Sequence, residues 1–457
     1  MSSPREVRIK LRPRVTCPHC WRSFAPEETL WISTHPALVG DARLGDDHQQ
    51  RFLPSRFNVE GAAIDSRGLA CQELACPHCH LPAPRALLEI APLFISIMGT
   101  PSCGKSYFLA SMSWQLRRIL PQHFAVSFGD ADPVSNKILN HYEEEQFFNP
   151  RRDELVRLAK TEEQGDLYDA VRYGDQVITY PRPFLFALRP NEHHAHYDEA
   201  ARIARILCLY DNAGVSFEPG KDTAANQVTR HLAQSQVLMF CFDPTQDPRF
   251  RDACRGRTHD PQILEQPVTS RQETVLHEVA ARIRKHTQTK QGEKHPQPLI
   301  VIVTKYDAWW PLLGEEHLPA PWSDSPRQGS CPFDLRAVEK VSARLRALLW
   351  RLCPEIVGGA EAFSQRVVFV PVSATGCPPQ CDPATGALGV RPRDLKPMWV
   401  ETPLLYALAR WGGGIVASTA SLPANAHTPR PTSAAPQQPA RTARHSGNGS
   451  SSPRESS

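Results

Sequence analysis

One short segment constrains the fold of this chain more than any other. Residues 92–98 form an apolar run that leads directly into the pattern G-x-x-x-x-G-K-S at residues 99–106. Glycines in this pattern let backbone N–H groups turn toward phosphate oxygens, while the lysine reaches the phosphates and the serine hydroxyl can ligate Mg²⁺. A helical pattern of apolar residues begins at Ser106 and is expected to stop at Pro121. Strand, loop and helix together predict a phosphate-binding loop made of Gly99, Thr100, Pro101, Ser102, Cys103, Gly104, Lys105 and Ser106.

Apolar runs alternate with helical stretches between residues 91 and 412. The expected strands are 92–98, 183–188, 203–210, 236–242, 298–304 and 366–372. A last helix is expected to begin at Thr402 and to end at Gly412. This alternation is typical of an α/β domain with a parallel sheet. We therefore predict a P-loop NTPase fold of the α/β class with helices on both faces of the sheet, and insertions at 121–180 and 309–334.

The regions that flank this domain differ from it in composition. Residues 413–457 are rich in Ser, Ala, Pro, Thr, Arg and Gly. Such a tail cannot bury enough apolar surface to offset the entropy lost on ordering, so we expect it to be disordered. No apolar run approaches the roughly 20 residues of a membrane helix, and the N-terminus lacks a signal-peptide core. A cytoplasmic location without membrane insertion is therefore the default.

Residues 1–90 contain two Cys-Pro-His-Cys sequences. Their C-x₂-C spacing places two thiolates on one metal ion, and two such pairs complete a tetrahedral Zn²⁺ site. The predicted ligands are Cys17, Cys20, Cys76 and Cys79. With four protein ligands the zinc would be structural, in a zinc-ribbon-like module with a loop or small subdomain inserted between the pairs. His19 and His78 are interpreted as exposed neighbours of the ligands, and Cys71 and His80 as possible substitutes.

Three further motifs follow the phosphate loop, each after an apolar run. The first is D-x-x-G, from Asp211 to Gly214, in which a carboxylate at a strand end holds Mg²⁺ and the glycine N–H turns toward a γ-phosphate. The second is T-K-x-D, with Thr304, Lys305 and Asp307. The third is S-A-T, with Ser373, Ala374 and Thr375.

These four motifs, in this order, resemble the G motifs of translation-factor and Ras-like (TRAFAC) GTPases. The resemblance implies a GTPase whose cofactors are GTP and Mg²⁺, with Ser106 and Asp211 as the magnesium ligands. It implies that Asp307 accepts hydrogen bonds from N1 and the 2-amino group of guanine and so discriminates GTP from ATP. Lys305 would lie over the base, and Ser373 with Ala374 would close its far edge.

The chain departs from the small GTPase pattern in the region of the catalytic residues. Lys105, Asp211 and Gly214 match the pattern, but the threonine that would cover Mg²⁺ is not evident. Thr179 is the best candidate for it, with Thr161 second. Val215 stands where many GTPases have a glutamine that orients water, so hydrolysis is expected to be slow or to need Glu218 or a partner.

The longer layout resembles the double-GTPase group of bacterial conflict systems. The shared features are the cysteine pairs, the Asp-Asn-Ala-Gly motif, the strand ending at Asp243-Pro244 and the closing Thr402-Pro403 helix, which together span about residues 15–412. This resemblance implies a regulatory GTPase with protein partners: a second GTPase, an effector or an activating protein.

Two other functions stay open. A P-loop ATPase or nucleotide kinase would share the phosphate loop but would have no reason for T-K-x-D. A zinc-ribbon adaptor could bind nucleotide and hardly hydrolyse it, which the missing glutamine favours. A nucleic-acid partner is not expected, because the net charge is only +4 and residues 1–90 show no dense basic stripe.

Overall fold

The computed structural model describes residues 11–158, 168–211, 228–264, 271–288, 290, 292–323, 330–383, 386 and 388–419. Met1–Ser421 form one compact unit and Leu422–Ser457 a second. The second unit contains most of the predicted disordered tail and lies outside the described residues.

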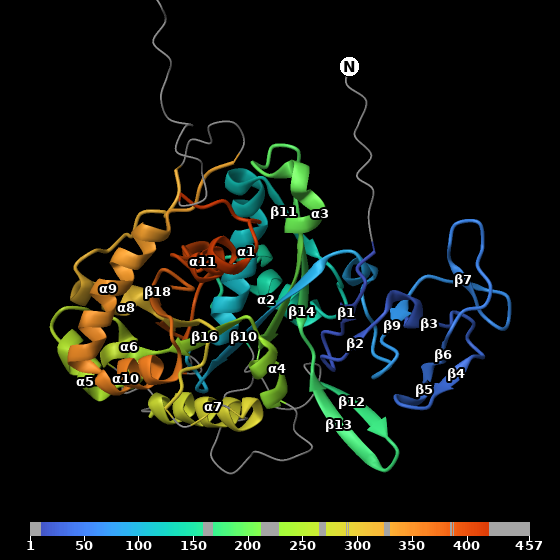
Figure 1. The fold of residues 1–457 in the computed structure, drawn as a ribbon. Helices are drawn as coiled ribbons and strands as arrows, with labels where there is room; N and C mark the ends of the chain where they lie inside the picture. Colours follow the sequence, from blue (N-terminus) through green and yellow to red (C-terminus); the bar gives the residue numbers. More distant parts are fainter. Residues whose placement is uncertain are drawn as a thin grey trace, which may run out of the picture. The chain divides into compact units, whose positions relative to one another are not determined.

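A seven-stranded mixed sheet forms the centre of the first unit (Figure 1). From edge to edge its strands are β11 (Val126–Asp130), β14 (Phe184–Pro190), β15 (Arg205–Asp211), β10 (Ala91–Gly99), β16 (Val237–Phe242), β17 (Leu299–Val303) and β18 (Val367–Pro371). Strand β14 is antiparallel to both of its neighbours, whereas the five strands from β15 to β18 run parallel. All six expected strands are present in this sheet, and the predicted α/β class is confirmed.

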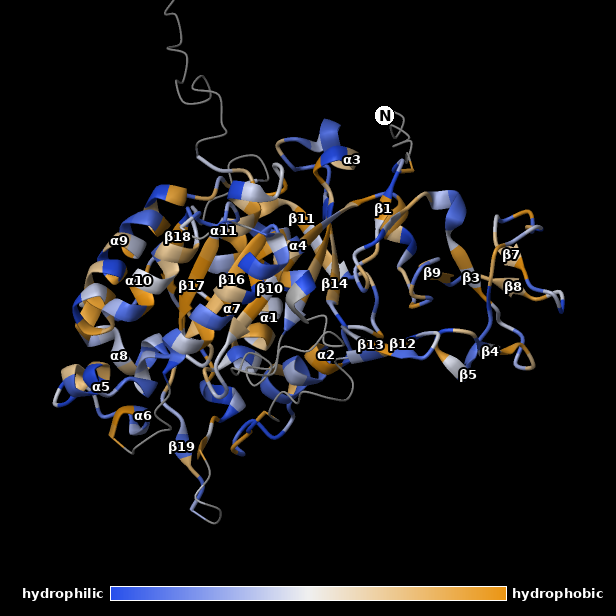
Figure 2. Cartoon of the chain, turned by 60° about the horizontal axis from the view of Figure 1, so that its bottom comes forward, coloured by the Kyte–Doolittle hydropathy of each residue, from blue (hydrophilic) through white to orange (hydrophobic). Residues whose placement is uncertain are grey.

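The parallel strands in the middle of the sheet are buried on both faces. Every residue of β16 and β17 is buried, and both strands read as uninterrupted apolar runs (orange in Figure 2). Strand β10 lies between β15 and β16. After β10 the chain first forms the strands on one side of it, which are β11, β14 and β15. It then crosses to the other side and forms β16, β17 and β18. The carboxyl end of such a strand is where open α/β sheets form ligand crevices.

The described helices are α1 (Lys105–Phe124), α2 (Lys137–Glu143), α3 (Ala200–Ile203), α4 (Val228–Gln234), α5 (Pro248–Cys254), α6 (Pro261–Leu264), α7 (Gln272–Thr287), α8 (Tyr306–Leu313), α9 (Leu335–Leu352), α10 (Pro354–Phe363) and α11 (Thr402–Trp411). Helix α11 begins at Thr402 as predicted and ends at Trp411, with Gly412 as its C-cap. The predicted end of α1 at Pro121 is wrong, because the helix continues to Phe124. Leu120 and Phe124 are fully buried, and this packing retains the last turn despite the proline.

The N-terminal module is built from short strands around the two cysteine pairs. Its strands are β1 (Val15–Thr16), β2 (Ser23–Phe24), β3 (Leu30–Ile32), β4 (Val39–Asp41), β5 (Gly45–Gln49), β6 (Arg51–Phe52), β7 (Ala63–Ile64), β8 (Ala70–Cys71) and β9 (Leu74–Ala75). The part between the cysteine pairs therefore contains β2 to β9. Small modules of this kind rarely bury enough apolar surface to be stable without a metal or a neighbouring domain.

This module covers the part of one face of the central sheet that β14, β15 and β10 form. Side chains of a strand alternate between the two faces, and Leu207 and Leu209 of β15 join the core that contains α1. Ile206, Cys208 and Tyr210 point to the other face and pack in a cluster with the four paired cysteines. The sequence predicted helices on both faces, but here the N-terminal module supplies much of the apolar cover.

Segments outside the minimal sheet domain contribute structure to the first unit. The described residues of the region 121–180 supply β11 and a hairpin of β12 (Tyr168–Tyr173) and β13 (Gln176–Pro181). The Tyr173 hydroxyl of this hairpin donates a hydrogen bond to the backbone oxygen of His78 at 3.4 Å.

Residues 413–419 were assigned to the tail, yet Ile415 and Val416 are buried. The packed part of the first unit therefore extends beyond residue 413, where the tail was expected to begin. A last short pair, β19 (Gln380–Cys381) and β20 (Leu388–Gly389), follows the S-A-T motif.

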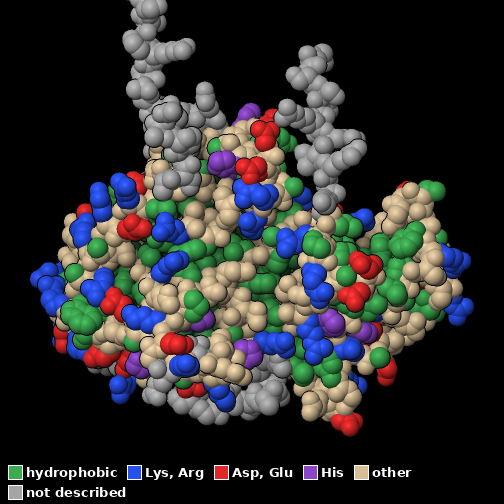
Figure 3. All heavy atoms as spheres, viewed as in Figure 1, with side chains coloured by type: hydrophobic (Ala, Val, Ile, Leu, Met, Phe, Trp, Pro, Cys, Tyr) green, Lys and Arg blue, Asp and Glu red, His purple; other side chains and the backbone are tan. Residues whose placement is uncertain are grey.

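The surface carries interspersed acidic and basic side chains, but hydrophobic side chains gather on the N-terminal module, at the right of Figure 3. The exposed apolar side chains of this module include Val39, Leu53, Phe57, Val59 and Leu69. Within the described part of the chain, no helix combines the length and the apolar character that crossing a membrane would require.

Candidate nucleotide-binding site and cysteine cluster

The loop that joins β10 to α1 has the backbone shape of an anion-binding nest. Ser102 and Gly104 adopt left-handed backbone conformations, with φ of 61° and 90°. Alternation of right- and left-handed residues turns successive N–H groups toward one side, and the N-terminus of the long helix α1 adds its dipole. Gly99 has a packing role as well, because a Cβ there would lie 2.7 Å from the backbone oxygen of Cys241.

Lys105 and Asp211 come together behind this loop. Lys105 is only 6% exposed, and burial alone would lower its pKa. The neighbouring Cys103 and Asp211 groups outweigh that effect and raise the pKa, so the ammonium form is retained. Asp211 ends β15 opposite Ile97 of β10, which explains why a strand-end carboxylate lies beside the loop. A lysine and a carboxylate in this arrangement suit a phosphate chain with a divalent cation.

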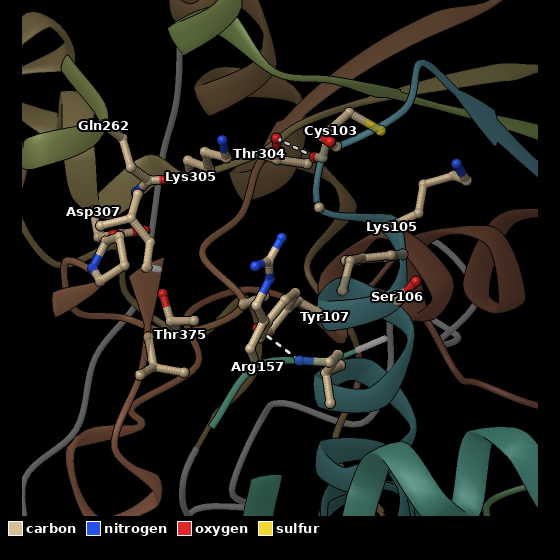
Figure 4. A pocket seen from close by; sticks show the side chains of 18 of the residues that line it. Cys103, Lys105, Ser106, Tyr107, Arg157, Gln262, Thr304, Lys305, Asp307 and Thr375 are labelled. Carbon is tan, nitrogen blue, oxygen red and sulfur yellow. Dashed lines mark hydrogen bonds between the residues drawn. The ribbon is translucent and has the colours of Figure 1, made fainter. Parts of the chain in front are cut away.

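A cavity of about 640 Å³ extends from the phosphate loop along the same edge of the sheet (Figure 4). This is within the usual range for pockets that hold small ligands. Its lining includes Pro101–Phe108 from the loop and α1, Thr304, Lys305 and Asp307 from T-K-x-D, Ala374 and Thr375 from S-A-T, and Arg157, Leu158 and Gln262. The fold therefore gathers three of the four predicted motifs around one cavity. Gly99, Thr100, Asp211 and Ser373 are buried close to these motifs without lining it.

Thr304 and Lys305 connect the end of β17 to the neighbouring strands. The Thr304 hydroxyl donates to the backbone oxygen of Cys103 in the phosphate loop at 2.9 Å. Lys305 adopts a left-handed conformation, and its Nζ lies 2.6 Å from Oδ2 of the fully buried Asp243. Sequence reasoning noted Asp243 as a strand end and missed this ion pair. The signal was present, because parallel neighbours β16 and β17 end at the same edge of the sheet.

Asp307 lines the cavity, and one oxygen of its carboxylate is fully buried. Its Oδ1 accepts a hydrogen bond from the Ser373 hydroxyl, whereas its buried Oδ2 has no hydrogen-bond partner among the described residues. Burial raises the pKa of Asp307 to about 7, against the opposing effect of the Ser373 hydrogen bond. Ser373 is held in turn by the backbone N–H of Gly376 at 2.7 Å. Gly376 is required there, because a Cβ would lie 1.8 Å from the backbone oxygen of Lys396.

The remaining predicted catalytic residues are not placed at the cavity. Thr179 lies on β13 of the hairpin, opposite Ala170, and does not line the cavity. Thr161, Gly214, Val215 and Glu218 fall outside the described residues. Arg157 was missed by sequence reasoning, because it lies in a stretch interpreted only as an insertion and carries no motif.

The four paired cysteines converge in the N-terminal module. Their sulfur atoms all lie within 4.8 Å of one another, and all four residues are fully buried. The Sγ atoms of Cys17 and Cys79 are 3.7 Å apart, and those of Cys20 and Cys76 are 3.8 Å apart. Sulfur atoms bound at 2.3 Å to a tetrahedral Zn²⁺ are separated by about 3.8 Å, so the cluster fits this ion.

The surroundings of the sulfur atoms also fit a metal site. The backbone N–H groups of His19 and His78 point to the Sγ atoms of Cys17 and Cys76, at 3.3 and 3.4 Å. Burial raises the pKa values of the Cys17 and Cys79 thiols, and a bound dication would favour their thiolate forms. The cluster is therefore compatible with a structural zinc site.

The structure places the other cysteine and histidine candidates of this module outside the cluster. The exposed position expected for His19 is wrong, because its side chain is buried beside Asp169, and burial lowers its pKa. Cys71 contacts Asp65, and Nδ1 of His80 lies 2.9 Å from Asp41. Neither substitutes for a member of the cluster.

The cysteine cluster is joined to the sheet by a buried polar contact. Trp21 follows Cys20, and its Nε1 donates to the Tyr210 hydroxyl at 3.0 Å. That hydroxyl donates to the backbone oxygen of Pro18, and the Trp21 ring also packs edge-on against His231 of α4. Tyr210 immediately precedes Asp211, so the module contacts the strand that carries the predicted magnesium ligand.

Comparisons with known proteins give limited similarity. No family model matches the chain. A curated relative, the putative ESX-1 scaffolding and assembly protein SaeC of Mycolicibacterium smegmatis, is 26% identical over 253 residues, which are 52% of this chain. The match spans 59% of that relative's length, less than two thirds. The match to the GTPase-like domain of S. cerevisiae Ski7, solved with bound GTP, covers 70% of this chain and 50% of the Ski7 chain at 12% sequence identity. Its TM-score of 0.28 is too low to show a common fold.

Proposed function

We propose that this protein is a GTP-binding, GTP-hydrolysing regulatory switch with a P-loop GTPase fold. The observation that carries the proposal is a cavity with the phosphate loop at one end and Asp307 at the other, whose buried Oδ2 has no hydrogen-bond partner among the described residues. Leaving a buried acceptor unpaired costs about 1–3 kcal/mol. Guanine supplies N–H donors at N1 and the 2-amino group, whereas adenine lacks that pair of donors.

The side chains around the cavity have complementary roles in this proposal. The loop N–H groups and Lys105 hold the phosphates, and Thr304 keeps the loop in register with the base-binding strand through its bond to Cys103. Ser106 and Asp211 would hold Mg²⁺, which would neutralise phosphate charge. The ammonium group of Lys305 is paired with Asp243, so only the alkyl part of its side chain would contact the base.

The decisive experiment compares the binding of GTP, ATP and XTP to the original protein and to Asp307→Asn. The original protein should prefer GTP, because ATP would leave the carboxylate unpaired. The variant should shift preference toward xanthine, whose 2-oxo group needs a donor. If the original protein binds ATP as tightly as GTP, the GTPase proposal fails and the P-loop ATPase takes its place.

We further propose that Cys17, Cys20, Cys76 and Cys79 bind one structural Zn²⁺. The support is the agreement of the sulfur separations with tetrahedral geometry and the complete burial of all four residues. Metal analysis of protein purified without added zinc should give about one equivalent per chain, and a value well below one would contradict the proposal.

A scaffold that binds nucleotide without appreciable turnover is the second candidate. It is favoured by the apolar side chains exposed on the N-terminal module and by the name of the mycobacterial relative. Membership of the double-GTPase group of conflict systems is a further proposal, which rests on the motifs alone. Single-turnover hydrolysis of bound GTP separates the candidates, since a switch converts its GTP and a scaffold retains it.

A further inference from the structure

The nucleotide cavity is lined by a basic side chain that belongs to none of the motifs. Among the described residues, three basic side chains line it: Lys105, Lys305 and Arg157. Lys305 is paired with Asp243, and Asp211 contributes to the charge balance of Lys105. Arg157 is exposed, and its side chain makes no hydrogen bond or ion pair with the part of the chain that the structure describes.

The backbone on both sides of Arg157 is fixed. Val156 exchanges two hydrogen bonds with Val390, at 2.9 and 3.1 Å. The N–H of Leu158 donates to the Tyr107 hydroxyl at 3.0 Å, and Leu158 itself is buried in the core. Tyr107 follows Ser106 in the first turn of α1, so the Arg157 backbone is tied directly to the phosphate loop.

The side chain of Arg157 extends into the middle of the cavity. In Figure 4 it lies between Lys305 and Asp307 on one side and Ser106 and Tyr107 on the other. The base-binding carboxylate and the phosphate loop mark the two ends of the cavity, so the sugar and the first phosphates occupy this middle region. A guanidinium offers five N–H donors in a planar fork that matches phosphate oxygens.

We propose that Arg157 is a further nucleotide-binding residue that contacts the phosphate chain where it joins the sugar. The proposal rests on the proposed function and deepens it, because the region interpreted as an insertion then completes the binding site. The guanidinium adds a positive charge for the phosphates, beside Lys105 and the proposed Mg²⁺, from the middle of the cavity. Its fixed backbone lowers the entropy cost of holding it there.

The test measures the affinities of GTP, GDP and guanosine for the original protein, Arg157→Ala and Arg157→Lys. Arg157→Ala should weaken GTP and GDP binding by about tenfold or more and leave guanosine binding unchanged. Arg157→Lys should recover part of the loss, because the charge is kept and the fork is lost. Arg152→Ala is the matched control: it removes an exposed charge from the same segment and should bind as the original protein does.

The possible failures can be told apart. If the original protein binds no guanine nucleotide, the proposed function itself is overturned. If it binds GTP and Lys105→Ala weakens binding by at least about tenfold, but Arg157→Ala binds within twofold of the original, the function stands and the role of Arg157 is refuted. An equal loss for guanosine and GTP would place Arg157 on the base or sugar and would also refute a phosphate contact, as would an equal loss in Arg152→Ala.

Discussion

The raised pKa of Asp307 predicts that base selectivity depends on pH. The carboxylate must be ionised to accept two hydrogen bonds from guanine, and burial raises its pKa to about 7 in the free protein. With this pKa, about nine tenths of the side chains are ionised at pH 8 and about one tenth at pH 6. If only the ionised form accepts guanine, GTP affinity should fall about tenfold between these values, or about 1.4 kcal/mol.

The assay must separate Asp307 from the titration of the nucleotide phosphates. Displacement of a fluorescent guanine nucleotide by GTP and by ATP, from pH 5.5 to 8.5, gives the ratio of the two affinities. Phosphate titration is common to both nucleotides and cancels in the ratio. The ratio for the original protein should fall about tenfold from pH 8 to pH 6, whereas in Asp307→Asn it should stay flat, because the amide does not titrate.

The same pKa has a consequence for the stability of the nucleotide-free protein. The folded protein holds the Asp307 proton more tightly than the unfolded chain does, so the contribution of this group falls as the pH rises from about 4 to about 7. Asp307→Asn should therefore stabilise the free protein at pH 8. A GTP preference that is independent of pH in the original protein would show that Asp307 stays ionised throughout and would refute the burial argument.

Three other perturbations have expected outcomes. Lys105→Ala should weaken binding of a non-hydrolysable GTP analogue by at least about tenfold, and unchanged affinity in the same displacement assay would contradict the role of the loop. Cys76→Ser should lose zinc and unfold the N-terminal module first in a denaturation monitored by limited proteolysis, whereas Cys71→Ser, outside the cluster, should retain the metal. Tyr210→Phe leaves the Trp21 N–H without its acceptor and should lower the unfolding free energy by about 1–3 kcal/mol, which an unchanged denaturant midpoint would disprove.

Much of the sheet could be predicted from the sequence, because its central strands are apolar runs buried on both faces. Strand β17 is such a run, and Thr304 follows it directly. The phosphate loop and the T-K-x-D residues were predictable for the same reason, since a motif after a buried strand must lie at one edge of a parallel sheet. The cysteine pairs were predictable because their spacing reflects the geometry of one metal ion.

The features that the sequence did not predict depend on contacts between distant segments. Arg157 reaches the cavity because Val156 pairs with Val390, and no local pattern encodes a pairing between these two segments. The continuation of α1 past Pro121 depends on the burial of Phe124 in a core assembled from other elements. Residues 413–419 were assigned to the tail from overall composition, which obscured the short apolar pair Ile415–Val416.

The contact between Trp21 and Tyr210 has a practical consequence for handling the protein. If the cluster holds zinc as proposed, a chelating buffer, a metal-affinity column or an acidic elution would disturb it, and Tyr210 would lose the partners that hold the end of β15. Asp211 is the next residue, so a batch stripped of metal should also lose affinity for nucleotide with magnesium. Weak binding in such a batch would reflect the history of the sample, and zinc content should be measured alongside every nucleotide titration.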